Sequence, residues 1–273
     1  MDIRLDKVSY KYKGTRREVL SNYSLELHEN TICGLLGKNG VGKTTTLYLM
    51  AGLLRPTSGS VTIGGMEAKR RQTEMLQDVF IVADEFNLPK MSLREYVSIN
   101  APFYPRFSEE MLHECLAEFE LASDINLAEL SMGEKKKVYI SFALATGTRV
   151  LLMDEPTNGL DIPAKGQFRK NVSRSMSDDR LIIISTHQVH DVEQLLDHIV
   201  IISEDGILLN ASTEQLTSDY VFETRTLDDM VDAIYAEPSL QGNLVMAPRG
   251  SRPETPLNLE LLFNAVTAGR NKE

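Results

Sequence analysis

The stretch Gly37-Lys38-Asn39-Gly40-Val41-Gly42-Lys43-Thr44 matches the pattern G-x-x-x-x-G-K-[ST] in full. The apolar run before it, residues 31–36, has the length of a buried parallel strand, and residues 44–51 can form a helix after it. The glycines permit a loop whose backbone N–H groups turn inward around phosphate oxygens, at the positive end of that helix. The order of strand, glycine loop and helix therefore predicts a nucleoside triphosphate site.

Two side chains at the end of this loop have specific chemistry. Lys43 can reach the β- and γ-phosphates of a nucleotide, and the Thr44 hydroxyl can ligate Mg²⁺ beside them. The plain alternative is a glycine-rich turn followed by a chance Lys-Thr pair. The flanking strand and helix favour the phosphate loop over that alternative.

Length and charge exclude several classes of protein. The chain has 273 residues, of which 42% are hydrophobic, and a formal net charge of −10. Such an acidic chain lacks the basic field of a dedicated nucleic-acid binder, so no nucleic-acid partner is expected. No apolar run approaches the roughly 18 residues that span a bilayer, and the first residues lack the pattern of a signal peptide. We therefore expect a cytoplasmic chain whose contact with a membrane is peripheral.

Periodicity divides the chain into segments. Residues 3–8 and 23–28 alternate between apolar and polar side chains, which predicts a small antiparallel unit before the phosphate loop. A turn is expected at residues 55–60, followed by a strand. Residues 93–119 have helical spacing interrupted by two prolines, which indicates a helical insert. The two cysteines show no metal-ligand or C-x-x-C spacing and are expected to be reduced.

Polar side chains follow two later apolar runs. Asp154 and Glu155 follow residues 150–153, and His187 comes shortly after residues 181–184. Asp154 can hold Mg²⁺, and Glu155 can orient or deprotonate an attacking water. His187 is expected at the same sheet edge, in reach of the γ-phosphate. A solvated acidic turn and a structural histidine are the alternatives.

A further motif is the run Leu130-Ser131-Met132-Gly133-Glu134. Ser131 is expected to cap a helix that continues to residue 145, and Gly133 lies in its first turn, where free N–H groups can hold an anion. An ordinary helix cap is the alternative. The lysines at 135–137 are typical of a solvated face.

Together these motifs resemble the ATP-binding-cassette (ABC) family, specifically the separately encoded ATPase subunit of an ABC transporter. The resemblance covers about residues 2–216, and its most specific element is the run 130–134, which is similar to the family signature L-S-G-G-Q. It implies an α/β P-loop fold with a mostly parallel core sheet, a small antiparallel N-terminal β unit and a helical subdomain at about 85–147. Residues 1–216 would form the cassette. Residues 217–273 would form an appendage ending in a helix similar to that of drug- and peptide-type (ABC-2) exporter ATPases.

The resemblance also implies roles for single residues. ATP and Mg²⁺ would be bound between two ATPase subunits, identical or related, arranged head to tail. Catalysis would involve Glu155 as base, His187 as switch, and Lys43, with Thr44 and Asp154 at the metal and Asp161 in the dimer loop. The implied ATP-binding residues are Tyr12, Gly37, Lys38, Asn39, Gly40, Val41, Gly42, Lys43, Thr44 and Thr45, and the residues implied to act in trans are Ser131, Met132, Gly133 and Glu134.

Three positions depart from the family pattern. The signature has Met132 for its first glycine and Glu134 for its glutamine. The family's Q-loop glutamine is replaced by Asp84, with Glu85 as the adjacent alternative, and an acid there keeps metal binding plausible. Because Lys43 and Glu155 are retained, the site is expected to be active.

These features predict an ATP-hydrolysing subunit that drives export through separate integral membrane permease subunits, on the cytoplasmic face of the membrane. Two alternatives remain open. One is a soluble ABC ATPase without a membrane partner, of the iron–sulfur assembly type. The other is a scaffold whose assembly is controlled by nucleotide binding alone.

Overall fold

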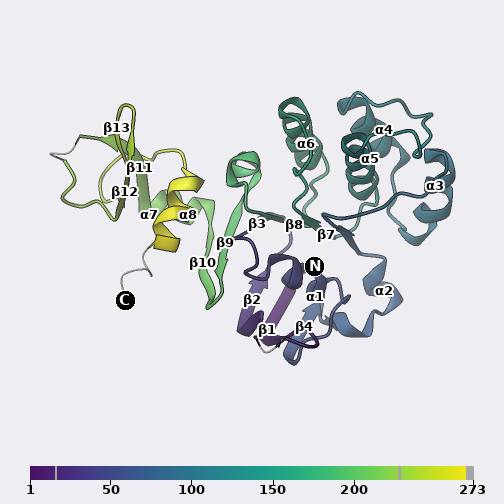
Figure 1. The fold of residues 1–273 in the computed structure, drawn as a ribbon, viewed down its shortest axis with the longest axis horizontal. Helices are drawn as coiled ribbons and strands as arrows, with labels where there is room; N and C mark the ends of the chain where they lie inside the picture. Colours follow the sequence, from purple (N-terminus) through teal and green to yellow (C-terminus); the bar gives the residue numbers. More distant parts are fainter. Residues whose placement is uncertain (16, 227–228, 269–273) are drawn as a thin grey trace.

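The computed structural model describes residues 1–15, 17–226 and 229–268 and is organised around a six-stranded sheet (Figure 1). Five of its strands are parallel, and only the edge strand β10 is antiparallel, which confirms the expected mostly parallel sheet. The phosphate-loop strand β3 lies between β9 and β8. In spatial order the strands are β10 (Gly206–Ser212), β9 (His198–Ser203), β3 (Thr31–Leu36), β8 (Leu181–Thr186), β7 (Val150–Asp154) and β6 (Val79–Val82).

A second, antiparallel sheet forms the N-terminal unit, as expected. Its order is β2 (Leu20–Leu27), β1 (Ile3–Tyr10), β4 (Ser58–Ile63) and β5 (Met66–Glu67). The strand β4 begins at Ser58, inside the predicted turn, because Ser9 and Asp6 of β1 pair with Ser58 and Ser60. Helix α1 (Lys43–Met50) packs between the two sheets, and its buried side chains join those of both in one apolar cluster.

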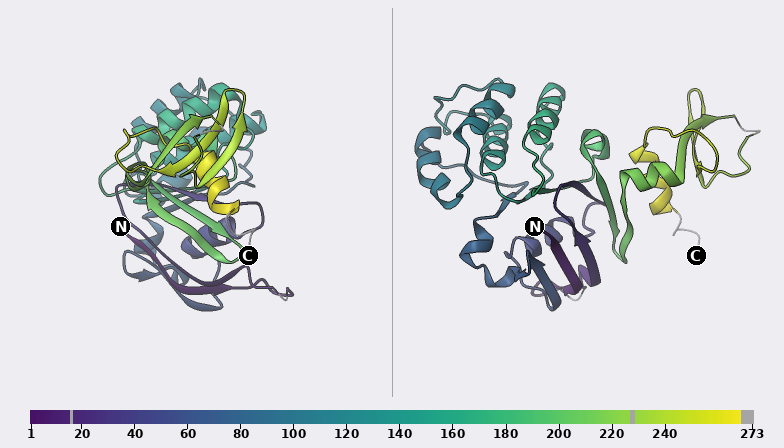
Figure 2. Two further views of the ribbon diagram at one scale, coloured as in Figure 1. Left: turned by 90° about the vertical axis from the view of Figure 1, so that its left-hand side faces the viewer. Right: turned by 180° about the vertical axis from the view of Figure 1, so that it is seen from behind.

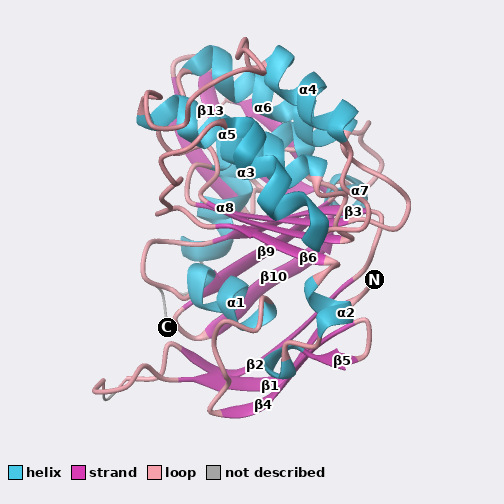
Figure 3. Ribbon diagram, turned by 90° about the vertical axis from the view of Figure 1, so that its right-hand side faces the viewer, coloured by secondary structure: helices cyan, strands magenta, loops and turns pink. Residues whose placement is uncertain are grey.

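Helices cover the other face of the core sheet (Figure 3). The predicted helical insert consists of α3 (Leu93–Asn100), a short 3-10 turn (Ala101–Phe103) and α4 (Glu109–Glu118), so the break at the prolines is confirmed. The covering helices α5 (Met132–Ala145) and α6 (Ile162–Arg174) follow, and the small helix α2 (Thr73–Leu76) lies before β6.

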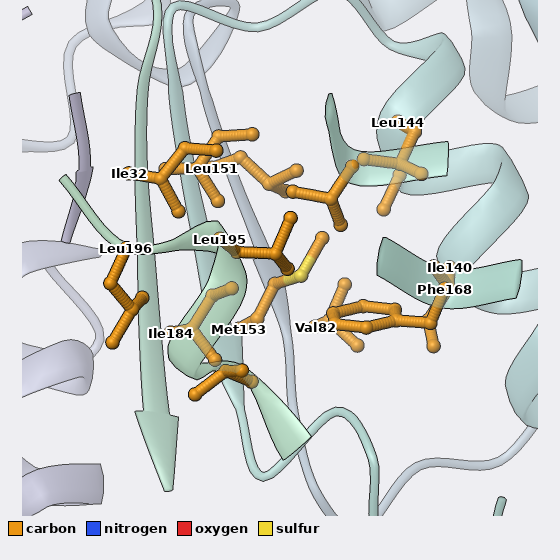
Figure 4. Packing of buried hydrophobic residues seen from close by; sticks show 14 of the residues in the cluster. Ile32, Val82, Ile140, Leu144, Leu151, Met153, Phe168, Ile184, Leu195 and Leu196 are labelled. Carbon is orange, nitrogen blue, oxygen red and sulfur yellow. The ribbon is translucent and has the colours of Figure 1, made fainter. Parts of the chain in front are cut away.

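The apolar core beneath these helices explains their orientation. Figure 4 shows strand side chains such as Leu151, Met153 and Ile184 packed against Ile140 and Phe168 from the helices. All five side chains are fully buried. Burying such side chains contributes about 1.5–3 kcal/mol each, which holds α5 and α6 against this face of the sheet.

The C-terminal part forms a lobe beside β10 (Figure 2). Sequence periodicity predicted its final helix, α8 (Leu259–Ala268), but not the three-stranded antiparallel sheet before it. That sheet has the order β11 (Tyr220–Arg225), β13 (Gly242–Pro248) and β12 (Tyr235–Ser239), and α7 (Thr213–Asp219) leads into it. Within the described ranges, no helix is both long and apolar enough to cross a bilayer.

Candidate functional site

The phosphate loop closes around the ammonium group of Lys43. Its Nζ donates hydrogen bonds to the carbonyl oxygens of Gly37 at 2.8 Å and Lys38 at 3.3 Å, and only 6% of the residue is exposed. Gly42, the N-cap residue just before α1, has a φ of 106°, a conformation that favours glycine. A Cβ at Gly37 would lie 2.7 Å from the carbonyl oxygen of Ile202, so the loop has no room for a side chain there.

Oxygen ligands gather where β7 ends beside the loop. The Thr44 hydroxyl donates to Asp154 Oδ2 at 2.7 Å, and the hydroxyl of Ser185, from β8, donates to the other carboxylate oxygen. Asp154 is 2% exposed. A hydroxyl and a carboxylate are the hard oxygen donors that Mg²⁺ prefers, so this pair fits the cation, with phosphate oxygens completing the shell. No group of three acidic, histidine or cysteine side chains forms a metal site by itself in the described ranges.

Glu155 is held by hydrogen bonds from β8 and the residue after it. Thr186 Oγ1 donates to its Oε2 at 2.9 Å, and His187 Nδ1 lies 2.9 Å from its Oε1. The Lys43 ammonium is 3.6 Å from the same Oε1. Glu155 has a φ of 44°, which is uncommon for a residue with a side chain and is typical of a functional position held by its surroundings.

Burial and charge oppose each other at Lys43. Desolvation lowers the pKa of its ammonium, and the nearby carboxylates of Glu155 and Asp154 act in the opposite direction. An anionic ligand in the loop adds a further opposite charge. Phosphate binding therefore favours the protonated lysine.

Of these side chains, Lys43, Thr44, Glu155 and His187 line one hollow of about 470 Å³, within the usual size of a small-molecule site. Tyr12 lies at its rim, 39% exposed, with its hydroxyl 3.0 Å from Thr45 Oγ1 and its ring edge-on to Tyr10. The lining residues are Tyr12, Val19, Asn39, Gly40, Gly42, Lys43, Thr44, Thr45, Asp84, Glu155, Asn158 and His187. The structure thus brings together the predicted phosphate loop, aromatic residue, acids and histidine.

The predicted signature lies outside this hollow. Ser131 caps α5, its hydroxyl accepting from the backbone N–H of Glu134, whose carboxylate accepts in return from Ser131. Those two hydrogen bonds from Ser131 hold the pKa of Glu134 below its usual range. Met132 is 67% exposed, and Asp161 caps α6 by accepting from the backbone of Ala164 at 2.8 Å. Within the described part of one chain, none of the four signature residues lines the hollow.

One prediction about the lysine run is wrong. Lys136 is 4% exposed, and its ammonium lies 3.4 Å from Asp84 Oδ1 and donates to the carbonyl oxygen of Glu155 at 3.1 Å. Burial lowers the pKa of Lys136, and the charge of Asp84 is the largest effect in the opposite direction. Helical spacing could have found it, because counting back four residues from the apolar Ile140 places 136 on the buried face.

Three polar residues near the site also had no role in the prediction. Thr186 and Ser185 bind the two acids, as described above. Asn158 donates to Asp84 Oδ1 at 3.4 Å and accepts from Gln188 at 3.0 Å. The sequence does contain a sign that Ser185 and Thr186 belong to the site. They lie between a buried apolar run and His187, where side chains of neighbouring parallel strands converge.

Comparison with known proteins gives one consistent result. The family model described as ABC transporter matches residues 20–158. The chain is 24% identical to the ABC transporter ATP-binding protein YtrB of Bacillus subtilis (strain 168), over 93% of this chain and 95% of that protein. It is 31% identical to the bacitracin transport ATP-binding protein BcrA of Bacillus licheniformis, over 72% and 66%. A solved structure of the ATP-binding subunit of an ABC transporter has the same fold, with a TM-score of 0.70 and 23% identity over 79% of this chain and 92% of the other.

Proposed function

Since this chain belongs to the ABC transporter family and is one of its nucleotide-binding ATPases, we propose that it drives export through separate membrane permease subunits. Two observations support this proposal, the first for a role in transport and the second for export. The first is similarity to BcrA, whose name assigns it to bacitracin transport. The second is the appended C-terminal lobe with its terminal helix, a feature of drug- and peptide-type exporter ATPases that is present here as α8.

Glu155 is proposed as the base that activates water for attack on the γ-phosphate. The observation that carries this proposal is its setting, in which Thr186, His187 and Lys43 hold both carboxylate oxygens at the hollow. His187 is proposed to hold the Glu155 carboxylate in position relative to the γ-phosphate. Thr44 and Asp154 would hold Mg²⁺, which neutralises phosphate charge when bound.

The second ATP-binding partner is proposed to be another ATPase subunit, arranged head to tail. The signature supports this, because Ser131 and Gly133 stand apart from the hollow of their own chain and are free to meet a nucleotide on another. Each ATP would then lie between one phosphate loop and one signature. ATP binding brings the subunits together, and hydrolysis releases them.

An exposed apolar groove supports docking of a permease. It has a volume of about 380 Å³ and lies between the core sheet and the helical insert. Leu53 and Phe103 line it and are 51% and 64% exposed, so two large apolar side chains share one exposed groove, as at a protein interaction site. We propose that a cytoplasmic helix of the permease occupies this groove.

Substitution of Lys43 with Met tests the nucleotide site. We expect the affinity for Mg²⁺-ATP to fall about 100-fold, because a charged hydrogen-bond donor to the phosphates contributes up to about 3 kcal/mol. Titration with a fluorescent ATP analogue measures the loss. The same change at Lys170, an exposed lysine of α6 paired with Glu118, serves as the control. Wild-type affinity in Lys43→Met would contradict the proposed site.

Substitution of Leu53 with Glu tests the permease groove. A charge in the groove should abolish co-purification from membranes with the permease, while hydrolysis by the isolated chain stays at the wild-type level, because Leu53 lies outside the nucleotide hollow. Val231→Glu is the matched control, since Val231 is 99% exposed on the C-terminal lobe. If Leu53→Glu is retained on membranes as well as Val231→Glu, the permease docks elsewhere.

A further inference from the structure

Lys136 is a buried cation that the proposed reaction scheme does not use. It comes from the first turns of α5, five residues after Ser131 of the signature. A buried ammonium is costly unless it is paired and hydrogen-bonded. Its position beneath the nucleotide hollow therefore needs an explanation in terms of what it contacts.

Three contacts define its position. The ammonium lies 3.4 Å from Asp84 Oδ1 in the loop after β6, and it donates to the carbonyl oxygen of Glu155 at 3.1 Å. It also lies 5.8 Å from the centre of the Phe86 ring, within the range of a cation–π contact. One side chain of α5 thus joins the segments that follow β6 and β7.

The contact with Glu155 acts on a backbone that needs support. Glu155 has a left-handed φ of 44°, and such a conformation persists only when the surrounding structure fixes it. Its N–H donates to the carbonyl oxygen of Ser185 at 2.9 Å, and its own carbonyl accepts from Asn158 N–H at 3.2 Å and from Lys136. Lys136 is the charged member of this set, and it contacts the peptide rather than the carboxylate.

Asp84 completes the arrangement. Its side chain is 42% exposed and lines the hollow, so the pair has one buried and one half-exposed partner. Asn158 donates to the same carboxylate oxygen, Oδ1. Asp84, the acid at the Q-loop position, is therefore already paired with a cation of the protein, Lys136. This pairing accounts for an aspartate and a lysine occurring together.

We propose that Lys136 is a positioning residue for ATP hydrolysis, which fixes the backbone of Glu155 through its carbonyl oxygen and uses Asp84 as its counter-ion. The inference rests on the proposed role of Glu155 in activating water. Loss of Lys136 frees the Glu155 peptide and moves its carboxylate away from the position in which it activates the attacking water. Loss of Asp84 leaves the Lys136 charge without its partner and weakens the same support.

The test compares Lys136→Met, Lys136→Arg, Asp84→Asn and the Lys136→Met/Asp84→Asn double variant in the full chain. We expect Lys136→Met to lower kcat about 10- to 100-fold, the scale of a small displacement of a catalytic group. The dissociation constant for a fluorescent ATP analogue should stay within about twofold, because the effect is on positioning and not on binding. Lys136→Arg should recover part of the rate. Lys170→Met is the control.

Asp84→Asn provides the second line of evidence, since Asp84 is half exposed and its substitution should leave the fold intact. We expect Asp84→Asn alone to lower kcat. In the Lys136→Met background the same substitution should lower kcat no further, because the two residues act through one contact. If Asp84 were instead a metal ligand, Asp84→Asn would raise the Mg²⁺ concentration needed for half-maximal rate. That result, additive effects, or wild-type kcat in Lys136→Met would overturn the proposal.

The two proposals fail in different ways. If Glu155→Gln keeps the wild-type rate, the proposed role of Glu155 is wrong. If Glu155→Gln is inactive while Lys136→Met turns over as wild type, only the positioning role is wrong. A variant that loses rate and ATP binding together would show a structural role for Lys136 and would also overturn the inference.

Discussion

Glu155→Gln is expected to lower ATP hydrolysis about 10²- to 10⁴-fold, the range that a positioned general base contributes. Glutamine keeps the shape of the side chain and an oxygen that can accept from Thr186, so the fold and the hollow should be preserved. It removes a negative charge that faces the γ-phosphate. ATP should therefore remain bound, and a stable ATP-dependent dimer should accumulate.

Two measurements check this expectation. Phosphate release is followed in Mg²⁺-ATP, and the oligomeric state is measured by sedimentation with ATP and with ADP. The matched control is Glu110→Gln, at an exposed position in the first turn of α4, which should leave both properties unchanged. A Glu155→Gln protein that hydrolyses ATP at the wild-type rate would exclude Glu155 as the base, and an inactive monomer in ATP would exclude the proposed cycle.

The fold was predictable because its signals are local. The strands β3, β7 and β8 are short apolar runs that end in functional residues, and their order around the phosphate loop follows from that pattern. The break in the helical insert followed from two prolines. Family membership then came from the run at residues 130–134, which is specific where a phosphate loop alone is not.

The C-terminal lobe was less accessible to sequence reasoning. Its sheet has strands of five to seven residues, and residues 235–239 include a proline and two charged or polar positions that weaken the pattern. Contacts between residues far apart in the sequence stabilise the lobe, for example the pairing of Arg252 with Glu223 and Asp232. Contacts of that kind depend on tertiary packing and leave no periodic trace.

The residues of the site also divide into those that the sequence predicts and those that it does not. Residues with a motif, such as Lys43 and Glu155, were assigned from spacing, whereas Lys136 was interpreted as part of a solvated run. Charge was the misleading signal, because a lysine is expected at the surface unless a partner compensates it. That partner, Asp84, lies 52 positions earlier in the chain, and only the fold brings the two together.

The signature offers the other large effect, and its test separates action in trans from action within one chain. A subunit with Lys43→Met should be inactive because its own nucleotide site is lost. A subunit with Gly133→Asp should be inactive because a carboxylate would face the phosphates of the partner's nucleotide. A Cβ at Gly133 would meet only the carbonyl oxygen of Gly159 at 3.4 Å, so the substitution is compatible with the folded chain.

Mixing the two inactive proteins should restore activity, because a mixed dimer contains one site with an intact phosphate loop and an intact signature. With free exchange, half of the dimers are mixed and each has one working site, so about a quarter of the wild-type rate is expected if the sites act independently. Gly166→Asp is the matched control and should be active alone, since Gly166 is also a half-buried helical glycine, where a Cβ would meet only the end of the Arg169 side chain at 3.9 Å. If the mixture stays inactive while subunit exchange is demonstrated by labelled chains, the signature does not act on the nucleotide of the partner. Recovery of the rate on mixing has no explanation within a single chain, because neither variant has a complete site of its own.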